Sequence, residues 1–132
     1  ERFYDEGEDV WPKRYAIWGR LIAQQPGQVA FAVTDSQAEM DYLPSVFPPY
    51  KADSIAELAA MAGLDGAKLE RVVAEYNAAV RPGTFRPTVP DDCRTEGLTP
   101  PKSHWARRIE KPPFILHPLK PGITFTFLAV KV

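Results

Sequence analysis

The sequence predicts a single α+β domain, in which a small mixed sheet carries a packed helical hairpin. Two amphipathic helices are expected in succession at the centre of the chain, and strand-like runs lie before and after them, at 28–35, 114–116 and 123–128. Because strands and helices are segregated rather than alternating, the pattern favours α+β over α/β. A length of 132 residues suits one domain with its own core.

The composition excludes several classes of protein. A net charge of −1 gives no reason to expect nucleic acid or an acidic membrane as a partner. No apolar run approaches the roughly 20 residues of a spanning helix, so direct membrane insertion is not expected. A single cysteine, Cys93, excludes an internal disulfide framework and suits a reducing compartment, so we expect a cytoplasmic protein.

The first predicted element is a helix over 15–23, preceded by a turn near Pro12. Pro26-Gly27 then signals a turn, and 28–35 is typical of a buried strand with Val29, Phe31 and Val33 on one face. Residues 36–50 are polar and then rich in proline, which predicts an extended loop that packs against another domain.

The helical hairpin has the clearest local signals. Ser54 and Glu57 form an S-x-x-E capping box, and Gly63 supplies the stop of the first helix. Asp65 caps the second helix, which Pro82-Gly83 ends. Its apolar stripe consists of Leu69, Val72, Val73, Tyr76 and Val80. Both helices are amphipathic, so we expect them to pack on a sheet.

The last third of the chain is irregular. Residues 84–112 hold few apolar residues and five prolines, which predicts a long surface excursion that is functional or braced by a neighbour. Two strand-like runs follow it, joined by 118–122. The chain starts with Glu1-Arg2 rather than Met and ends in strand-like residues, so we expect 1–132 to be one domain of a larger protein.

Few residues suggest chemistry by type and spacing. His104, His117 and Cys93 do not stand at metal-ligand spacing, so no metal site is expected. The sequence has no G-x-G-x-x-G, P-loop or G-x-S-x-G motif. Arg107 and Arg108, close to Trp105, could bind a carboxylate, although a solvated or interdomain pair is the favoured interpretation.

Several runs resemble the FAD-dependent fumarate reductase/succinate dehydrogenase-like flavoproteins. They are Arg2-Phe3-Tyr4-Asp5-Glu6, Ala52-Asp53-Ser54-Ile55-Ala56-Glu57-Leu58, Gly63-Leu64-Asp65, Leu69 to Asn77, and Pro121-Gly122-Ile123-Thr124-Phe125-Thr126. In order and spacing they resemble the capping domain, which closes over substrate on the flavin. The runs Trp11 to Trp18, Asp92 to Lys102 and His104 to Arg107 look most similar to the tricarballylate dehydrogenase branch.

The resemblance implies an activity and a site. Members of that branch oxidise a saturated tricarboxylate to its alkene with FAD as hydride acceptor. Laying Leu21-Ile22-Ala23-Gln24 on the family's "ILAQ" helix end places Arg14 on the arginine that transfers the proton. The implied partners are the FAD-binding domain of the same chain and a small polycarboxylate. Without that domain, 1–132 is expected to bind no FAD tightly and to be inactive.

Two departures from the family pattern keep alternatives open. Thr124 and Phe125 stand where fumarate reductases carry paired histidines, so the hydroxyl of Thr124 or Thr126 is the candidate to bind a substrate carboxylate. Phe127-Leu128-Ala129 replaces the usual "MGG". A fumarate reductase-like or 3-ketosteroid dehydrogenase-like flavoenzyme domain is one alternative, and a non-catalytic protein-interaction domain is another.

Overall fold

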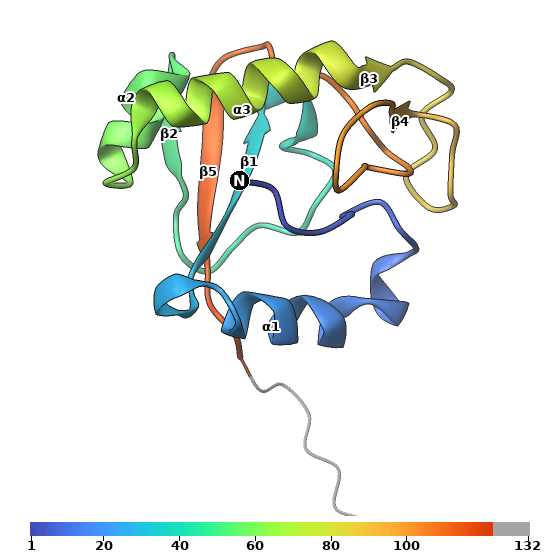
Figure 1. Cartoon of the computed structure of the whole chain (residues 1–132), viewed down its shortest axis with the longest axis horizontal. Coiled ribbons are helices and arrows are strands. Elements are labelled where there is room, and N and C mark those ends of the chain that lie inside the picture. Colours follow the sequence, from blue (N-terminus) through green and yellow to red (C-terminus); the bar gives the residue numbers. More distant parts are fainter. Residues whose placement is uncertain (123–132) are drawn as a thin grey trace, which may run out of the picture.

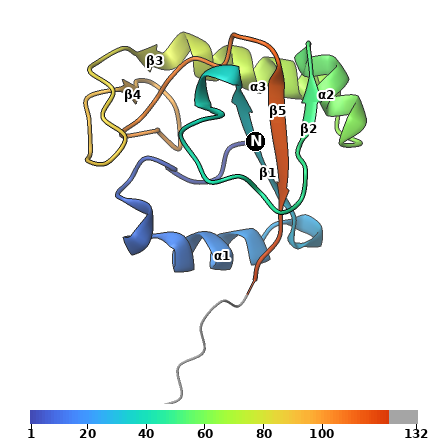
Figure 2. The same cartoon turned by 180° about the vertical axis from the view of Figure 1, so that it is seen from behind.

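A computed structural model describes residues 1–122 and has an α+β fold, as the sequence predicts. Its main sheet is antiparallel with the strand order β1-β5-β2, formed by β1 (Ala30–Asp35), β5 (Phe114–Leu119) and β2 (Tyr50–Ala52). Figures 1 and 2, from opposite sides, place α3 (Gly66–Ala79) at one end of the strands and α1 (Tyr15–Ala23) at the other. The strand predicted over 123–128 lies outside the described residues.

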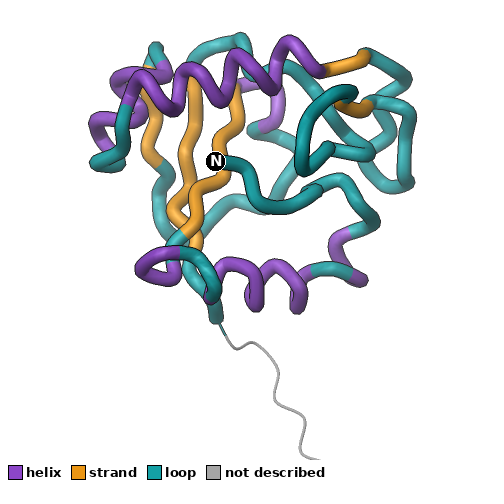
Figure 3. Tube along the Cα trace, viewed as in Figure 1, coloured by secondary structure: helices purple, strands orange, loops and turns teal. Residues whose placement is uncertain are grey.

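Strand β5 runs through the centre of the sheet (Figure 3), and its residues Ile115 and Leu116 are fully buried. The strand continues through Pro118, which the sequence placed in a connection. Proline has no N–H for a sheet hydrogen bond, so it is tolerated only where no neighbouring strand needs that donor. Here β2 ends its pairing at Leu116, so β5 has β1 as its only paired strand in the described sheet at Pro118.

The prediction of a buried face on β1 is wrong in detail. Phe31 is 37% exposed, and the buried residues of the strand are Ala30 and Asp35 at its ends. The reason is the position of the hairpin, because α2 (Ile55–Met61) packs mainly on β2 and β5 and leaves this edge strand open.

The helical hairpin forms as predicted, through hydrogen bonds within a few residues. Ser54 Oγ accepts from the N–H of Glu57, and Asp65 Oδ1 accepts from the N–H of Lys68 at 3.0 Å. Gly63 has φ +67° after the last turn of α2. The N–H groups of Gly63 and Leu64 then bind the carbonyls of Ala60 and Ala59, which closes the helix end.

The prediction that Val80 belongs to the apolar stripe of the second helix is wrong. Helix α3 ends at Ala79, and Val80 has an extended backbone (φ −61°, ψ 127°) and starts β3 (Val80–Arg81). That short strand pairs with β4 (Arg94–Thr95). Val80 is still buried, because strand pairing turns it toward the excursion rather than along the helix face.

The excursion over 84–112 is more than a surface loop. It closes a second core, in which Tyr76, Val80 and Ala106 are buried and Leu98 and Ile109 pack against them. Asp91 braces it from inside, since its carboxylate accepts from the backbone N–H groups of Arg86, Cys93 and Trp105. A buried carboxylate that gathers three amides organises a segment with little regular structure.

Candidate functional site

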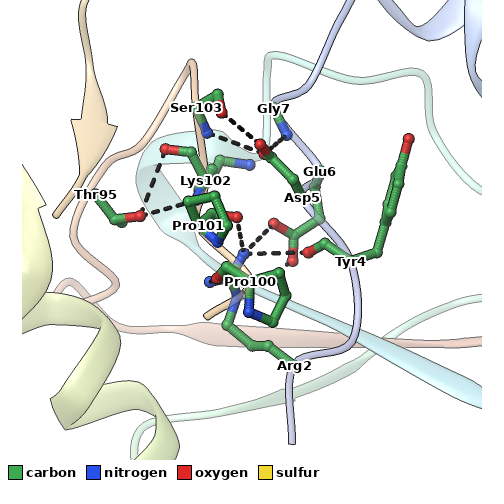
Figure 4. A network of polar contacts seen from close by, with 10 residues as sticks. All are labelled: Arg2, Tyr4, Asp5, Glu6, Gly7, Thr95, Pro100, Pro101, Lys102 and Ser103. Carbon is green, nitrogen blue, oxygen red and sulfur yellow. Dashed lines mark hydrogen bonds and ion pairs between the residues drawn. The ribbon is translucent and has the colours of Figure 1, made fainter. Parts of the chain in front are cut away.

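The opening stretch is anchored on the excursion (Figure 4). Arg2 Nη2 lies 2.6 Å from Glu6 Oε2, and the same guanidinium donates to the carbonyls of Pro100 and Pro101 at 2.6 and 3.0 Å. Asp5 Oδ1 accepts from the N–H of Ser103 at 2.9 Å. These contacts fix residues 2–6 in place ahead of the predicted proton-transferring arginine.

At Gly7 the opening stretch lies in close contact with the backbone of His104 in the excursion. A Cβ at Gly7 would lie 2.3 Å from the carbonyl oxygen of His104, a distance that backbone atoms cannot accept. Only glycine therefore lets the opening stretch lie against the excursion. This contact sets where Glu8, the next residue, presents its carboxylate.

Arg14 stands at the N-cap of α1, and its guanidinium turns back to the opening stretch. Its Nη2 lies 3.0 Å from Glu8 Oε1. The side chain is 29% exposed, and Nε is shielded from solvent with no hydrogen-bond partner among the described residues. The arginine predicted from the sequence is thus partly desolvated and paired with a carboxylate.

Tyr4 is the third residue of a cluster that we call the Arg14 cluster, which consists of Tyr4, Glu8 and Arg14. Its hydroxyl donates to Glu8 Oε2 at 2.6 Å, so Glu8 binds Tyr4 with one oxygen and Arg14 with the other. The rings of Tyr4 and Trp18 meet edge to face with centroids 6.0 Å apart. Burial, and after it the hydrogen bond and charge of Glu8, raise the pKa of Tyr4. The phenol therefore stays a proton donor to Glu8 at neutral pH.

The sequence singled out Arg14 but missed Glu8 and Tyr4. Glu8 is one of several acids in the opening stretch, and nothing in its spacing separates it from its neighbours. The conformation of the chain between the two residues, which includes the 3-10 turn Trp11–Lys13, brings its carboxylate to Arg14. The predicted carboxylate ligands Thr124 and Thr126 lie outside the described residues.

The described residues contain no metal-binding cluster. No group of three or more His, Cys, Asp or Glu side chains within residues 1–122 is placed to hold a metal ion. The sequence has no glycine-rich phosphate-binding motif. Within the same residues, no helix has the length and apolar character needed to cross a bilayer.

No family model matches this chain, and no curated protein or solved structure shows a significant match to it. The site is therefore interpreted from its own geometry.

Proposed function

We propose that this chain is the capping domain of an FAD-dependent oxidoreductase that interconverts a small, tricarballylate-like polycarboxylate and its alkene. The observation that carries the proposal is the ion pair between Arg14 and Glu8, at 3.0 Å. Free arginine has a pKa above about 12 and is a poor acid or base. It acts in proton transfer when a carboxylate beside it can take or return the proton.

In this proposal the chain's own residues move a proton and orient the substrate. FAD bound to the partner domain would supply the acceptor for the hydride of one substrate carbon. The proton of the neighbouring carbon passes to the Arg14 guanidine as a guanidinium proton passes to Glu8. Glu8, whose side chain is 41% exposed, releases that proton to solvent. The positive charge of Arg14 also attracts the substrate carboxylates.

The surface over 40–47 supports a partner domain. Four apolar side chains are 80–92% exposed there, namely Met40, Leu43, Val46 and Phe47. Apolar residues gathered at this exposure mark contact surfaces. In the proposal this surface lies against the FAD-binding domain of the same chain. We place the enzyme in the cytoplasm, where the buried, unpaired Cys93 stays reduced.

The test uses the intact flavoprotein with Arg14→Lys. Lysine keeps the charge but loses the guanidinium that pairs with Glu8, so alkene formation should fall by about 10²-fold or more while FAD content is unchanged. Arg20→Lys, an exposed arginine on the same helix, is the matched control and should leave turnover unchanged. Full turnover by the Arg14 variant overturns the role of Arg14. A panel of tricarballylate, succinate and a 3-ketosteroid separates the flavoenzyme alternatives.

The same exposed apolar surface also favours a second candidate, a non-catalytic protein-interaction domain. The two candidates differ in what accompanies 1–132 in the intact protein. A flavoenzyme carries a G-x-G-x-x-G segment and bound flavin, whereas an interaction domain carries neither. An intact protein purified without flavin, which takes up none when FAD is added, would favour the interaction domain.

A further inference from the structure

A cleft lies apart from the Arg14 cluster, and none of the residues of that cluster lines it. It has a volume of about 270 Å³ and lies between the end of β1, helix α3 and the excursion. Aromatic rings of Tyr76, Phe85 and Trp105 line it. An apolar cavity of about 150 Å³ can bind benzene, so this space is large enough for a single-ring molecule.

The cleft carries more free positive than negative charge. Its cations are Lys102, Arg107 and Arg108, and its acids are Asp35 and Asp41. Both acids are already engaged: Asp41 pairs with Arg107, and Asp35 accepts four hydrogen bonds from Gln37, Glu110 and Lys111. Arg108 makes no ion pair with any described residue, and its side chain is exposed at the cleft.

Lys102 is the partly buried cation of the cleft. No hydrogen bond reaches its ammonium within residues 1–122, although the charges of Glu6 and Asp5 act on it favourably. Burial lowers the pKa of Lys102, the charges of Arg2 and Arg107 lower it further, and the charges of Glu6 and Asp5 act in the opposite direction. A bound anion would supply the missing charge.

The wall formed by Trp105 is held in place before any ligand arrives. Its backbone has φ +56°, a left-handed conformation that is costly for a bulky residue. The N–H of Trp105 donates to Asp91 Oδ1 at 2.8 Å, and its indole N–H donates to the carbonyl of Arg86 at 2.7 Å. A second aromatic residue of the lining, Phe85, has the guanidinium of Arg107 over its ring, with Cζ 4.1 Å from the ring centroid. Rigid aromatic walls bind a planar body at low entropic cost.

We propose that this cleft binds a small carboxylate with a planar, apolar body, its carboxylate held by Arg108 and Lys102 and its body between the aromatic rings. Arg107 contacts Phe85 and pairs with Asp41, whereas Arg108 is left available for a ligand. A carboxylate site therefore explains the arginine pair beside Trp105 better than two solvated side chains would. The proposal does not depend on the flavoenzyme function.

The test is a nuclear magnetic resonance titration of the 132-residue chain with benzoate, following the assigned indole N–H resonance of Trp105. A saturable shift is expected, and neutral benzamide at equal concentrations should give none. Acetate, which has no planar body, should bind more weakly than benzoate. Arg108→Gln should weaken benzoate binding about tenfold, since a hydrogen bond to a charged group is lost. Lys102→Met should weaken it at least as much.

The controls decide between this site and a general attraction of anions. Arg71→Gln, an exposed arginine on α3 away from the cleft lining, should leave binding unchanged. Equal shifts from benzoate and benzamide, or unchanged affinity in Arg108→Gln, would overturn the proposal. So would tighter binding of tricarballylate than of benzoate. Arg14→Lys should not affect the titration, so failure here and failure of the flavoenzyme proposal are separate results.

Discussion

Glu8 joins Arg14 to Tyr4 through its two carboxylate oxygens, at 3.0 Å and 2.6 Å. Tyr4 and Glu8 belong to the opening stretch, and Arg14 is the N-cap residue of α1. A carboxylate with both oxygens engaged has a fixed orientation, so the guanidinium that it pairs with is positioned as well.

Glu8→Gln should lower the pKa of Tyr4 toward its ordinary value without restoring it. The variant removes the negative charge that opposes the tyrosinate, while burial, the larger cause, remains. Tyrosinate absorbance against pH measures the change. The stability change should stay below about 1 kcal/mol, because the ion pair with Arg14 is partly exposed. An unchanged Tyr4 titration, compared with the exposed control Glu70→Gln, contradicts the contact.

Under the proposed function, the same Glu8→Gln variant of the intact protein should slow alkene formation about 10²-fold, because Gln could not take the proton that would leave Arg14. FAD content should match the wild type. Wild-type turnover in this variant would show that Arg14 exchanges its proton with another group.

Asp35→Asn should lower the free energy of unfolding at pH 7 by about 2 kcal/mol. Asparagine has one acceptor oxygen, so it cannot accept both from the N–H of Gln37, now at Oδ1, and from the N–H groups of Glu110 and Lys111, now at Oδ2. Chemical denaturation measures the free energy of unfolding, and Asp53→Asn, at an exposed residue, is the control. A loss no larger than in the control would show that these hydrogen bonds contribute little.

The lowered pKa of Asp35 also predicts how the free energy of unfolding depends on pH. Burial alone would raise the pKa of Asp35, but hydrogen bonds from Gln37, Lys111 and Glu110 hold it below the ordinary value of 3.8. A lowered folded-state pKa contributes stability that is complete above the unfolded-state value and is lost as pH falls through the folded-state value. Stability should therefore fall below about pH 4, and less steeply in Asp35→Asn. Asp91, with the same sign, supplies part of the remaining slope.

Gly63→Ala and Gly19→Ala form a matched pair. A Cβ meets no atom within 4 Å at either site, so only the backbone conformation differs. Gly63 has φ +67°, and alanine there should cost about 1 kcal/mol. Gly19 is inside α1, and alanine should stabilise the protein by up to about 1 kcal/mol. Equal effects in thermal unfolding would contradict the helix end at Gly63.

Thr34→Val should stabilise the domain by about 1 kcal/mol. Thr34 Oγ1 is buried without a hydrogen-bond partner among the described residues, and valine keeps the shape without the desolvation cost. Thr88→Val, at an exposed residue of the excursion, is the control and should change the stability little. Destabilisation by Thr34→Val in calorimetry would reveal a partner for the hydroxyl.

Local signals were enough for the helical hairpin. Ser54, Gly63 and Asp65 act on backbone groups within five residues, so their roles are visible in the sequence and reappear unchanged in the structure. Val80 departs from its predicted helical place because pairing with Thr95 competes with the helix, and that partner is distant in the chain.

The sequence by itself determined the α+β class and the hairpin with its caps, whereas the role of Arg14 is implied only by the family resemblance and stays a proposal. Only the tertiary structure decided that Glu8 is the partner of Arg14, that Asp35 is a buried acceptor, and that Lys102 and Arg108 share a cleft. The physical reason is range. Caps and helix stops depend on neighbouring residues, whereas the hydrogen bonds of Asp35 and the cleft depend on distant segments that only folding brings together.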